Sequence, residues 1–365
     1  MLWIFLCLFL TVGEVAVASN EEDTYYPLMV GFSGTHPEAQ EVEELKDALA
    51  RGLISGVIFF RHNVVDPKQV GDLTDAFMEA NTPLPPLLAV DQEGGRVQRL
   101  SSINGFESFP SAKEMGEKPE EERQELYKRF AGQVRSAGFN YVLGPVVDLH
   151  KDEAPAIGAL SRSFGEDPEH VAACARDFID AHKRLGIATS LKHFPGHGFA
   201  RRDTHKGFVD VTDTFDTREL LPFENLAKAG LADSIMVAHV TNKNFGDNLP
   251  ASLSPHTGQT LRDGWGYDGV VISDDFHMGA IVDMFPDPCE VGALAARAGV
   301  DLLLYSYNKM AAQGRKELPQ TVLEALQAGI REKLGEDFKP LQQEASRRVN
   351  ALRERLWKRG EDVLH

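Results

Sequence analysis

The amino-acid sequence predicts a single (β/α)₈ barrel with C-terminal helices, on three observations. Eight short apolar runs recur along the chain, at Pro27–Phe32, Gly56–Phe60, Pro86–Val90, Tyr141–Val147, Ala188–Leu191, Ser234–Ala238, Gly269–Ile272 and Val300–Tyr305. Runs that are apolar at nearly every position are typical of parallel strands covered on both faces. Amphipathic stretches alternate with these runs, and eight such units favour a closed barrel over an open sheet.

The stretches with a helical pattern between the strands are Glu38–Arg51, Pro67–Asn81, Glu120–Gly138, Pro168–Leu185, Arg218–Ala229 and Cys289–Ala298. The final stretch, Leu318–Leu356, is expected to form one or two helices that pack outside the barrel. No low-complexity run or Pro/Ser-rich linker divides the sequence after residue 24. Because barrels often reach this length as one domain, we expect residues 19–365 to form a single barrel domain.

The charge balance narrows the choice of partners. The chain has 55 acidic and 38 basic residues, which gives a formal net charge of −17 at pH 7. Such a surface repels polyanions, so nucleic acid and anionic lipid are not expected as partners. The chain has only three cysteines, which excludes a disulfide framework and leaves stability to the hydrophobic core.

The N-terminus resembles an export signal. Residues 1–10 are apolar, and Ala16-Val17-Ala18 offers a small-residue cleavage site. The pattern predicts a signal peptide over residues 1–18, too short to span a membrane, and hence a periplasmic or secreted protein with no integral membrane segment after cleavage. No Lys or Arg precedes Lys46. The alternative is therefore a mis-assigned start in front of a cytoplasmic protein.

The barrel fold predicts where chemistry takes place, because barrel active sites lie at the C-terminal ends of the strands. The polar residues at the predicted strand ends are Ser33, Arg61, Asp91, Asp148, Lys192, His193, His239, Asp274, Asp275 and Ser306. Converging strand ends with mainly ionisable side chains predict a polar pocket.

Asp274 follows the segment Gly269-Val270-Val271-Ile272-Ser273, so its carboxylate is expected at the barrel mouth. A carboxylate there can attack an anomeric carbon, bind a metal or cap the next helix. Asp275 is the better candidate for the cap, since Asp commonly precedes a helix.

Residues 192–198 read Lys-His-Phe-Pro-Gly-His-Gly, and Lys192 and His193 end the fifth strand. The Pro-Gly turn prevents His193 and His197 from sharing a helical face, which argues against a zinc site. The donor side chains suit the recognition of hydroxyl groups instead. In the next loop, Asp203 precedes His205 by two residues and can accept its ring N–H.

Two arginine-containing segments complete the pattern. After Asp91, the pair Gly94-Gly95 allows a tight turn, and Arg99 can fold back over the pocket. Ser161-Arg162-Ser163-Phe164-Gly165 follows the fourth strand and brings another arginine to the rim.

Together these motifs resemble glycoside hydrolase family 3. The segments that carry the resemblance, in this order along the chain, are Asp91-Gln92-Glu93-Gly94-Gly95-Arg96-Val97-Gln98-Arg99, Lys192-His193-Phe194-Pro195-Gly196-His197-Gly198, Asp203-Thr204-His205 and Ser273-Asp274-Asp275. They are most similar to the β-N-acetylhexosaminidase branch, which includes the peptidoglycan-recycling β-N-acetylglucosaminidases. The resemblance extends from about residue 26 to at least residue 305. It implies a single barrel, a covalent glycosyl-enzyme intermediate with retained anomeric configuration, and no cofactor or metal.

The resemblance also implies a role for each matched residue. Asp274 matches the nucleophile, His205 the acid/base on a mobile loop, and Asp203 its partner. The residues that match those holding the sugar are Asp91, Arg99, Arg162, Lys192 and His193. Residues 157–162 form a slightly longer segment than the family pattern. The implied substrate has a terminal, non-reducing β-linked N-acetylglucosamine, as in peptidoglycan fragments.

Several alternatives stay open. Within the same family, a β-glucosidase or a glycoside phosphorylase is an alternative. A metal-dependent amidohydrolase could use His193, His239 and Asp274 as ligands, yet Gly31-Phe32-Ser33 replaces the His-x-His pair usual at its first strand. A non-catalytic sugar-binding protein would need neither Asp274 nor the Asp203–His205 pair.

Overall fold

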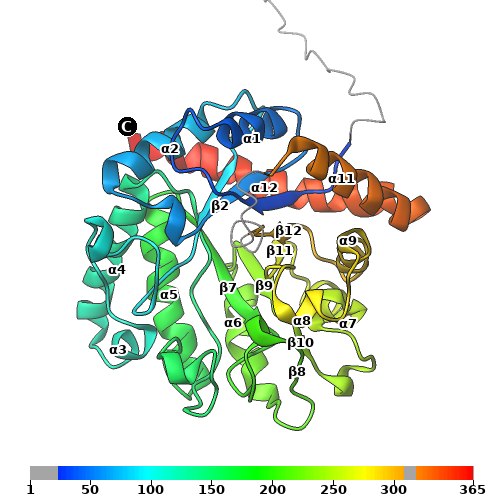
Figure 1. Ribbon diagram of the computed structural model, residues 1–365. Helices are drawn as coiled ribbons and strands as arrows, with labels where there is room; N and C mark the ends of the chain where they lie inside the picture. Colours follow the sequence, from blue (N-terminus) through cyan, green and yellow to red (C-terminus); the bar gives the residue numbers. More distant parts are fainter. Residues whose placement is uncertain (1–23, 308–317, 365) are drawn as a thin grey trace, which may run out of the picture.

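A computed structural model describes residues 24–307 and 318–364, so the predicted signal peptide lies outside the described residues. Its central feature is an eight-stranded parallel sheet in which each strand pairs with the next one along the barrel (Figure 1). The strands are β1 (Leu28–Gly31), β2 (Gly56–Phe59), β3 (Leu87–Val90), β6 (Tyr141–Val142), β7 (Ala188–Phe194), β9 (Ser234–Val237), β11 (Val270–Ser273) and β12 (Leu303–Tyr305). A parallel bridge between Ile272 and Leu302 joins β11 to the start of β12. The predicted barrel is therefore confirmed, with one strand in each of the eight apolar runs.

Helices surround the barrel on the outside. They are α1 (Gln40–Ala50), α2 (Pro67–Met78), α3 (Ala112–Gly116), α4 (Glu120–Ser136), α5 (Pro168–Arg184), α6 (Leu221–Lys228), α7 (Pro255–Gly258), α8 (Gly279–Val282) and α9 (Pro288–Arg297). Asp66, Asp167 and Asp287 each precede a helix that begins with proline, and each carboxylate accepts a backbone N–H of the first turn. The Asp-Pro pair starts these helices because the carboxylate satisfies a free donor and proline has none to satisfy.

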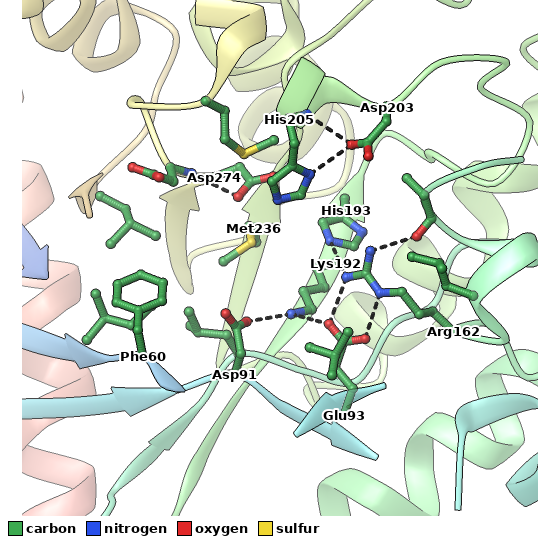
Figure 2. Close-up of a pocket in the computed structure, with 18 of the residues that line it drawn as sticks. Phe60, Asp91, Glu93, Arg162, Lys192, His193, Asp203, His205, Met236 and Asp274 are labelled. Carbon is green, nitrogen blue, oxygen red and sulfur yellow. Dashed lines mark hydrogen bonds and ion pairs between the residues drawn. The ribbon is translucent and has the colours of Figure 1, made fainter. Parts of the chain in front are cut away.

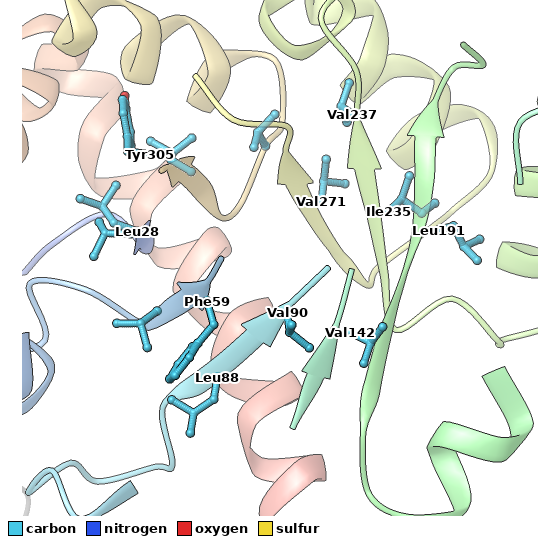
Figure 3. Packing of buried hydrophobic residues seen from close by; sticks show 14 of the residues in the cluster. Leu28, Phe59, Leu88, Val90, Val142, Leu191, Ile235, Val237, Val271 and Tyr305 are labelled. Atoms are coloured by element: carbon cyan, nitrogen blue, oxygen red, sulfur yellow. The ribbon is translucent and has the colours of Figure 1, made fainter. Parts of the chain in front are cut away.

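Alternate residues of each strand face two different layers of the core. In β3, Leu88 and Val90 point outward to the helices, whereas Leu87 and Ala89 point into the barrel. Figure 3 shows the outward set, which includes Leu88, Val90 and Ile235. This alternation follows from the two-residue repeat of a strand, and it explains why the strands are apolar at every position.

The C-terminal helices are α11 (Gln320–Leu334) and α12 (Phe338–Leu364). Both pack outside the barrel, as expected, and α12 lies across its N-terminal end. Val349, Leu352 and Leu356 belong to the same apolar cluster as the strand residues inside the barrel. Arg353 donates hydrogen bonds to the carbonyls of Leu84 and Pro85, just before β3. The end opposite α12 is therefore the open mouth. No helix within residues 24–307 or 318–364 is both long and apolar enough to cross a membrane.

Candidate active site

A cavity of about 390 Å³ opens at the C-terminal ends of the strands, as the barrel fold predicts. All eight residues predicted for the site line it, namely Asp91, Arg99, Arg162, Lys192, His193, Asp203, His205 and Asp274. Figure 2 labels these residues apart from Arg99. They come from the ends of β3, β7 and β11 and from the loops between them. The structure thus brings together residues that are as far as 183 positions apart in the chain.

One wall of the cavity is a network of two carboxylates and three cations. Lys192 Nζ lies 2.9 Å from Asp91 Oδ1 and 2.6 Å from Glu93 Oε1. Arg99 binds the other Asp91 oxygen at 2.9 Å. Arg162 makes a two-pronged contact with Glu93, with both distances at 2.8 Å. Each charge faces an opposite one, so the network presents fixed donors and acceptors to a ligand.

The charges of this network keep both carboxylates ionised. Burial by itself would raise the pKa of Glu93, but Arg162 and Lys192 outweigh it and lower that pKa to about 2. The pKa of Asp91 is likewise held well below its usual range by Lys192 and Arg99 against the effect of burial. Glu93 was missed as a site residue from the sequence, although it lies within the Asp91–Arg99 motif.

A short hairpin holds the arginine side of this wall. Strands β4 (Gln92–Gly94) and β5 (Val97–Gln98) pair antiparallel, and Gln92 Oε1 accepts the backbone N–H groups of Arg99 and Leu100. Gly94 has φ +95°, and a Cβ there would lie 2.2 Å from the Pro110 carbonyl oxygen. Only glycine fits this turn, which folds Arg99 back over the pocket as predicted.

His193 is fixed from beneath by the buried Asp148. Its Nδ1 lies 2.6 Å from Asp148 Oδ2, and its Nε2 lies 3.3 Å from Arg162. Asp148 Oδ1 also accepts the backbone N–H groups of His193 and His197, at 3.2 and 2.9 Å. One carboxylate without solvent exposure therefore orients both histidines of the Lys-His-Phe-Pro-Gly-His-Gly segment.

A second buried carboxyl supports the turn in this segment. Glu219 Oε1 accepts the backbone N–H of Gly198 at 2.7 Å. Burial and the neighbouring Asp148 raise the pKa of Glu219 to about 8, although N–H groups of the turn act in the opposite direction. A Cβ on Gly198 would lie 2.0 Å from the Leu149 carbonyl oxygen, so the turn needs glycine here.

Asp203 and His205 face the cavity from the short 3₁₀ turn η5 (Thr204–Lys206) and the residue before it. Asp203 Oδ1 lies 2.8 Å from His205 Nδ1 and accepts the His205 backbone N–H at 3.0 Å. In the view of Figure 2, the His205 imidazole lies between the carboxylates of Asp203 and Asp274. The predicted pair is thus formed, on the wall that faces Lys192.

The tandem carboxylates after β11 have different surroundings. Asp274 lines the cavity, and its Oδ1 accepts the backbone N–H of Asp275 at 2.8 Å. Asp275 accepts hydrogen bonds from the N–H and hydroxyl of Ser306, which joins β11 to the end of β12. We expected Asp275 to cap the next helix, but α8 begins at Gly279 after Met278. Among the described residues, no side chain is hydrogen-bonded or ion-paired to Asp274, so its second oxygen is available to the cavity.

The alternative metal site is not formed by the described side chains. His239 is bound at Nδ1 by Ser252 and at Nε2 by the carbonyl of Asp275. Among residues 24–307 and 318–364, no group of three or more His, Cys, Asp or Glu side chains is arranged to hold a metal ion.

Comparisons with known proteins agree with this geometry. The model of the glycosyl hydrolase family 3 N terminal domain matches residues 26–336. A β-hexosaminidase of Xylella fastidiosa is 39% identical over 265 residues, which are 70% of this chain and 76% of the relative. A β-hexosaminidase of Stenotrophomonas maltophilia is 36% identical over 308 residues, 79% of this chain and 87% of the relative.

Solved structures show the same relationship. A family 3 β-N-acetylglucosaminidase from Paenibacillus superposes with a TM-score of 0.78 at 29% identity, over 90% of this chain and 61% of that one. A β-N-acetylhexosaminidase from Beutenbergia cavernae gives a TM-score of 0.76 at 29% identity, over 90% and 96% of the two chains. The family match, the barrel and the carboxylate-rich pocket lead to one conclusion: the chain belongs to glycosyl hydrolase family 3 and is a glycoside hydrolase.

Proposed function

We propose that the protein is a retaining β-N-acetylhexosaminidase, which releases terminal β-linked N-acetylglucosamine from the non-reducing end of its substrate. The observation that carries the proposal is the Asp203–His205 pair, which shares one cavity with the carboxylate of Asp274. The names of the relatives support the choice of sugar, since they are β-hexosaminidases and β-N-acetylglucosaminidases.

In the first step, a carboxylate oxygen of Asp274 forms a bond to C1 of the sugar. The bond between C1 and the leaving oxygen breaks, and His205 donates its Nε2 proton to that oxygen. Asp203 stabilises the charged imidazole and fixes its orientation, as an acidic partner does in hydrolytic triads. This acid assistance typically accelerates such a step by about 10²–10⁴-fold.

In the second step, water attacks C1 of the glycosyl-enzyme. His205 now accepts a proton from the water, and Asp274 leaves as a carboxylate. Two displacements at C1 restore the β configuration, which makes the enzyme a retaining one. Each proton and bond is accounted for by these residues and water.

The opposite wall holds the sugar. Asp91 accepts hydrogen bonds from hydroxyls, whereas Lys192, Arg99 and Arg162 donate them. His193 lines the same wall beside Arg162. Because the ion pairs among these residues already fix their side chains, little ordering remains to be done when the substrate binds. Binding energy is thereby available to align C1 with Asp274.

We further propose peptidoglycan fragments as the natural substrate. The support is the resemblance to the recycling β-N-acetylglucosaminidases. The predicted export signal is atypical of those cytoplasmic enzymes and would place the same activity outside the cytoplasm. A fragment of glycan chain ending in N-acetylglucosamine is then hydrolysed at its first linkage.

A panel of aryl β-glycosides that differ at C2 tests the function. We expect strong preference for the 2-acetamido sugar over glucose and galactose. Equal or greater activity on the glucoside would favour the β-glucosidase alternative. Added phosphate should leave the product as free N-acetylglucosamine; formation of the sugar 1-phosphate would instead indicate a phosphorylase. A chelator should not change the rate of hydrolysis. Inactivation of the enzyme by the chelator would favour the metal-dependent alternative.

A further inference from the structure

Thr204 lies between the two residues of the acid/base pair and faces the opposite way. Only 2% of Thr204 is exposed, whereas the His205 side chain is 66% exposed. The loop thus turns one residue into the protein body while its neighbours face the cavity. A buried hydroxyl in an otherwise exposed loop needs a hydrogen-bond partner.

That partner is His197. Thr204 Oγ1 lies 3.3 Å from His197 Nε2. Among the described residues, this is the one hydrogen bond that links the side chains of residues 201–208 to the rest of the protein; the bonds between Asp203 and His205 stay within the loop. The loop also packs closely against Gly279 of α8, where a Cβ would lie 2.9 Å from Gly207 N.

His197 lies in the buried body of the protein. It is almost fully buried, and its backbone N–H donates to Asp148 Oδ1. Burial, with a smaller effect of His193, lowers the pKa of His197 to about 4, so the ring is neutral at neutral pH. A neutral imidazole nitrogen and a hydroxyl can always form a hydrogen bond, because the hydroxyl both donates and accepts.

The same Asp148 carboxylate also orients His193, which lines the cavity. A continuous chain of contacts therefore runs from the sugar-binding His193 through Asp148 and His197 to Thr204. None of Asp148, His197 and Thr204 lines the cavity itself. Their arrangement places the acid/base loop in a defined position relative to the wall that holds the sugar.

We propose that His197 and Thr204 are positioning residues that seat the His205 loop over the sugar bound against Asp274. The contact between their side chains anchors the loop, and Asp148 ties this anchor to His193. The inference rests on the proposed function, since it assigns a purpose to seating His205. Small displacements of a catalytic group are costly, because proton transfer requires hydrogen-bond distance to the leaving oxygen.

The central test compares Thr204→Val, which removes the hydroxyl at nearly constant volume, with Thr204→Ser, which keeps it. The substrates are two aryl β-N-acetylglucosaminides, one with dinitrophenol and one with phenol as leaving group. We expect Thr204→Val to lose about tenfold or more in kcat on the phenyl substrate. On the dinitrophenyl substrate, which needs little protonation, the loss should be under about threefold. Thr204→Ser should restore most of the activity.

The matched control is Thr257→Val. Thr257 is also 2% exposed, and its hydroxyl is hydrogen-bonded to the Ala251 carbonyl away from the cavity. This variant should keep wild-type rates on both substrates. An equal loss on both substrates in Thr204→Val, or rates unchanged on both, would overturn the inference.

A double-mutant cycle with His197→Phe tests the contact itself. If the two side chains act through each other, the double variant loses little more than either single variant. Losses that multiply would contradict a shared role. KM should change little in each case, because neither residue touches the sugar.

Hydrogen exchange provides a readout that does not depend on activity. The backbone amides of residues 201–208 should exchange faster in Thr204→Val than in the wild type or in Thr257→Val. Unchanged exchange would overturn the anchoring role even for an active enzyme. Conversely, a wild type that hydrolyses no aryl β-N-acetylglucosaminide would refute the proposed function, while the exchange experiment would still decide whether the loop is anchored.

Discussion

The Asp203 carboxylate binds His205 twice, since its Oδ1 lies 2.8 Å from the imidazole Nδ1 and accepts the backbone N–H at 3.0 Å. Burial would raise the pKa of Asp203, but the two hydrogen bonds from His205 hold it below its ordinary value. The ionised carboxylate can only accept, so Nδ1 is the donor. The proton that His205 exchanges with a substrate is therefore the one on Nε2.

Replacing Asp203 by Asn should impair proton transfer without removing the histidine. The amide no longer stabilises a charged imidazole and can present an N–H to Nδ1, which disturbs its orientation. We expect kcat/KM on a phenyl β-N-acetylglucosaminide to fall by about 100-fold, with a smaller loss on the dinitrophenyl substrate. Asp213→Asn is the control, because Asp213 is exposed and lies outside the cavity. Wild-type rates for Asp203→Asn would remove Asp203 from the mechanism.

Glu93→Gln tests whether the carboxylates of the sugar-binding wall support its cations. The change leaves Lys192 and Arg162 with one counter-charge fewer in a buried network. Breaking a buried ion pair in this way typically costs about 3–5 kcal/mol. We expect the free energy of unfolding in urea to fall by about 3 kcal/mol and KM to rise. The exposed Glu117→Gln should change neither quantity; equal stability of both variants would contradict the assigned role of Glu93.

The raised pKa of Glu219 predicts a specific dependence of the free energy of unfolding on pH. The pKa of its carboxyl is raised from 4.5 to about 8 in the folded protein, chiefly by burial. Between these values the folded state binds a proton that the unfolded state has released, so stability falls as pH rises and levels off above about 8. The slope from this group is at most about 1.4 kcal/mol per pH unit.

Glu219→Gln is neutral at every pH and keeps an oxygen acceptor for Gly198. The free energy of unfolding of this variant, relative to that of the wild type, should therefore increase steadily between about pH 4.5 and 8. Parallel pH profiles for the two proteins would show that Glu219 is not buried as a neutral acid.

Asp91, Lys192 and Asp274 could be predicted from the sequence because each lies at the C-terminal end of an apolar run. In a parallel barrel that position alone places the side chain at the mouth. The Asp203–His205 pair was predictable for another reason, since the two residues are neighbours in sequence and their contact is local.

Glu93, Asp148 and His197 were harder to assign, because their roles depend on contacts between segments far apart in the chain. Glu93 becomes a site residue only where β7 brings Lys192 against it. Asp148 contributes to the site because it orients His193, which is 45 positions away in the sequence. The position of α12 across the end of the barrel could not be predicted from the sequence either. The same apolar stripe suits a helix that packs beside the barrel or across its end.

The most direct test of the account is to locate the covalent intermediate. A fluorinated N-acetylglucosaminyl fluoride, which slows release of the sugar, should add one glycosyl unit to the protein. After proteolysis, mass spectrometry should find the sugar on the carboxylate of Asp274, and Asp274→Ala should acquire none. A glycosyl group on another residue, or an active enzyme that never becomes labelled, would contradict the central claim that Asp274 is the nucleophile.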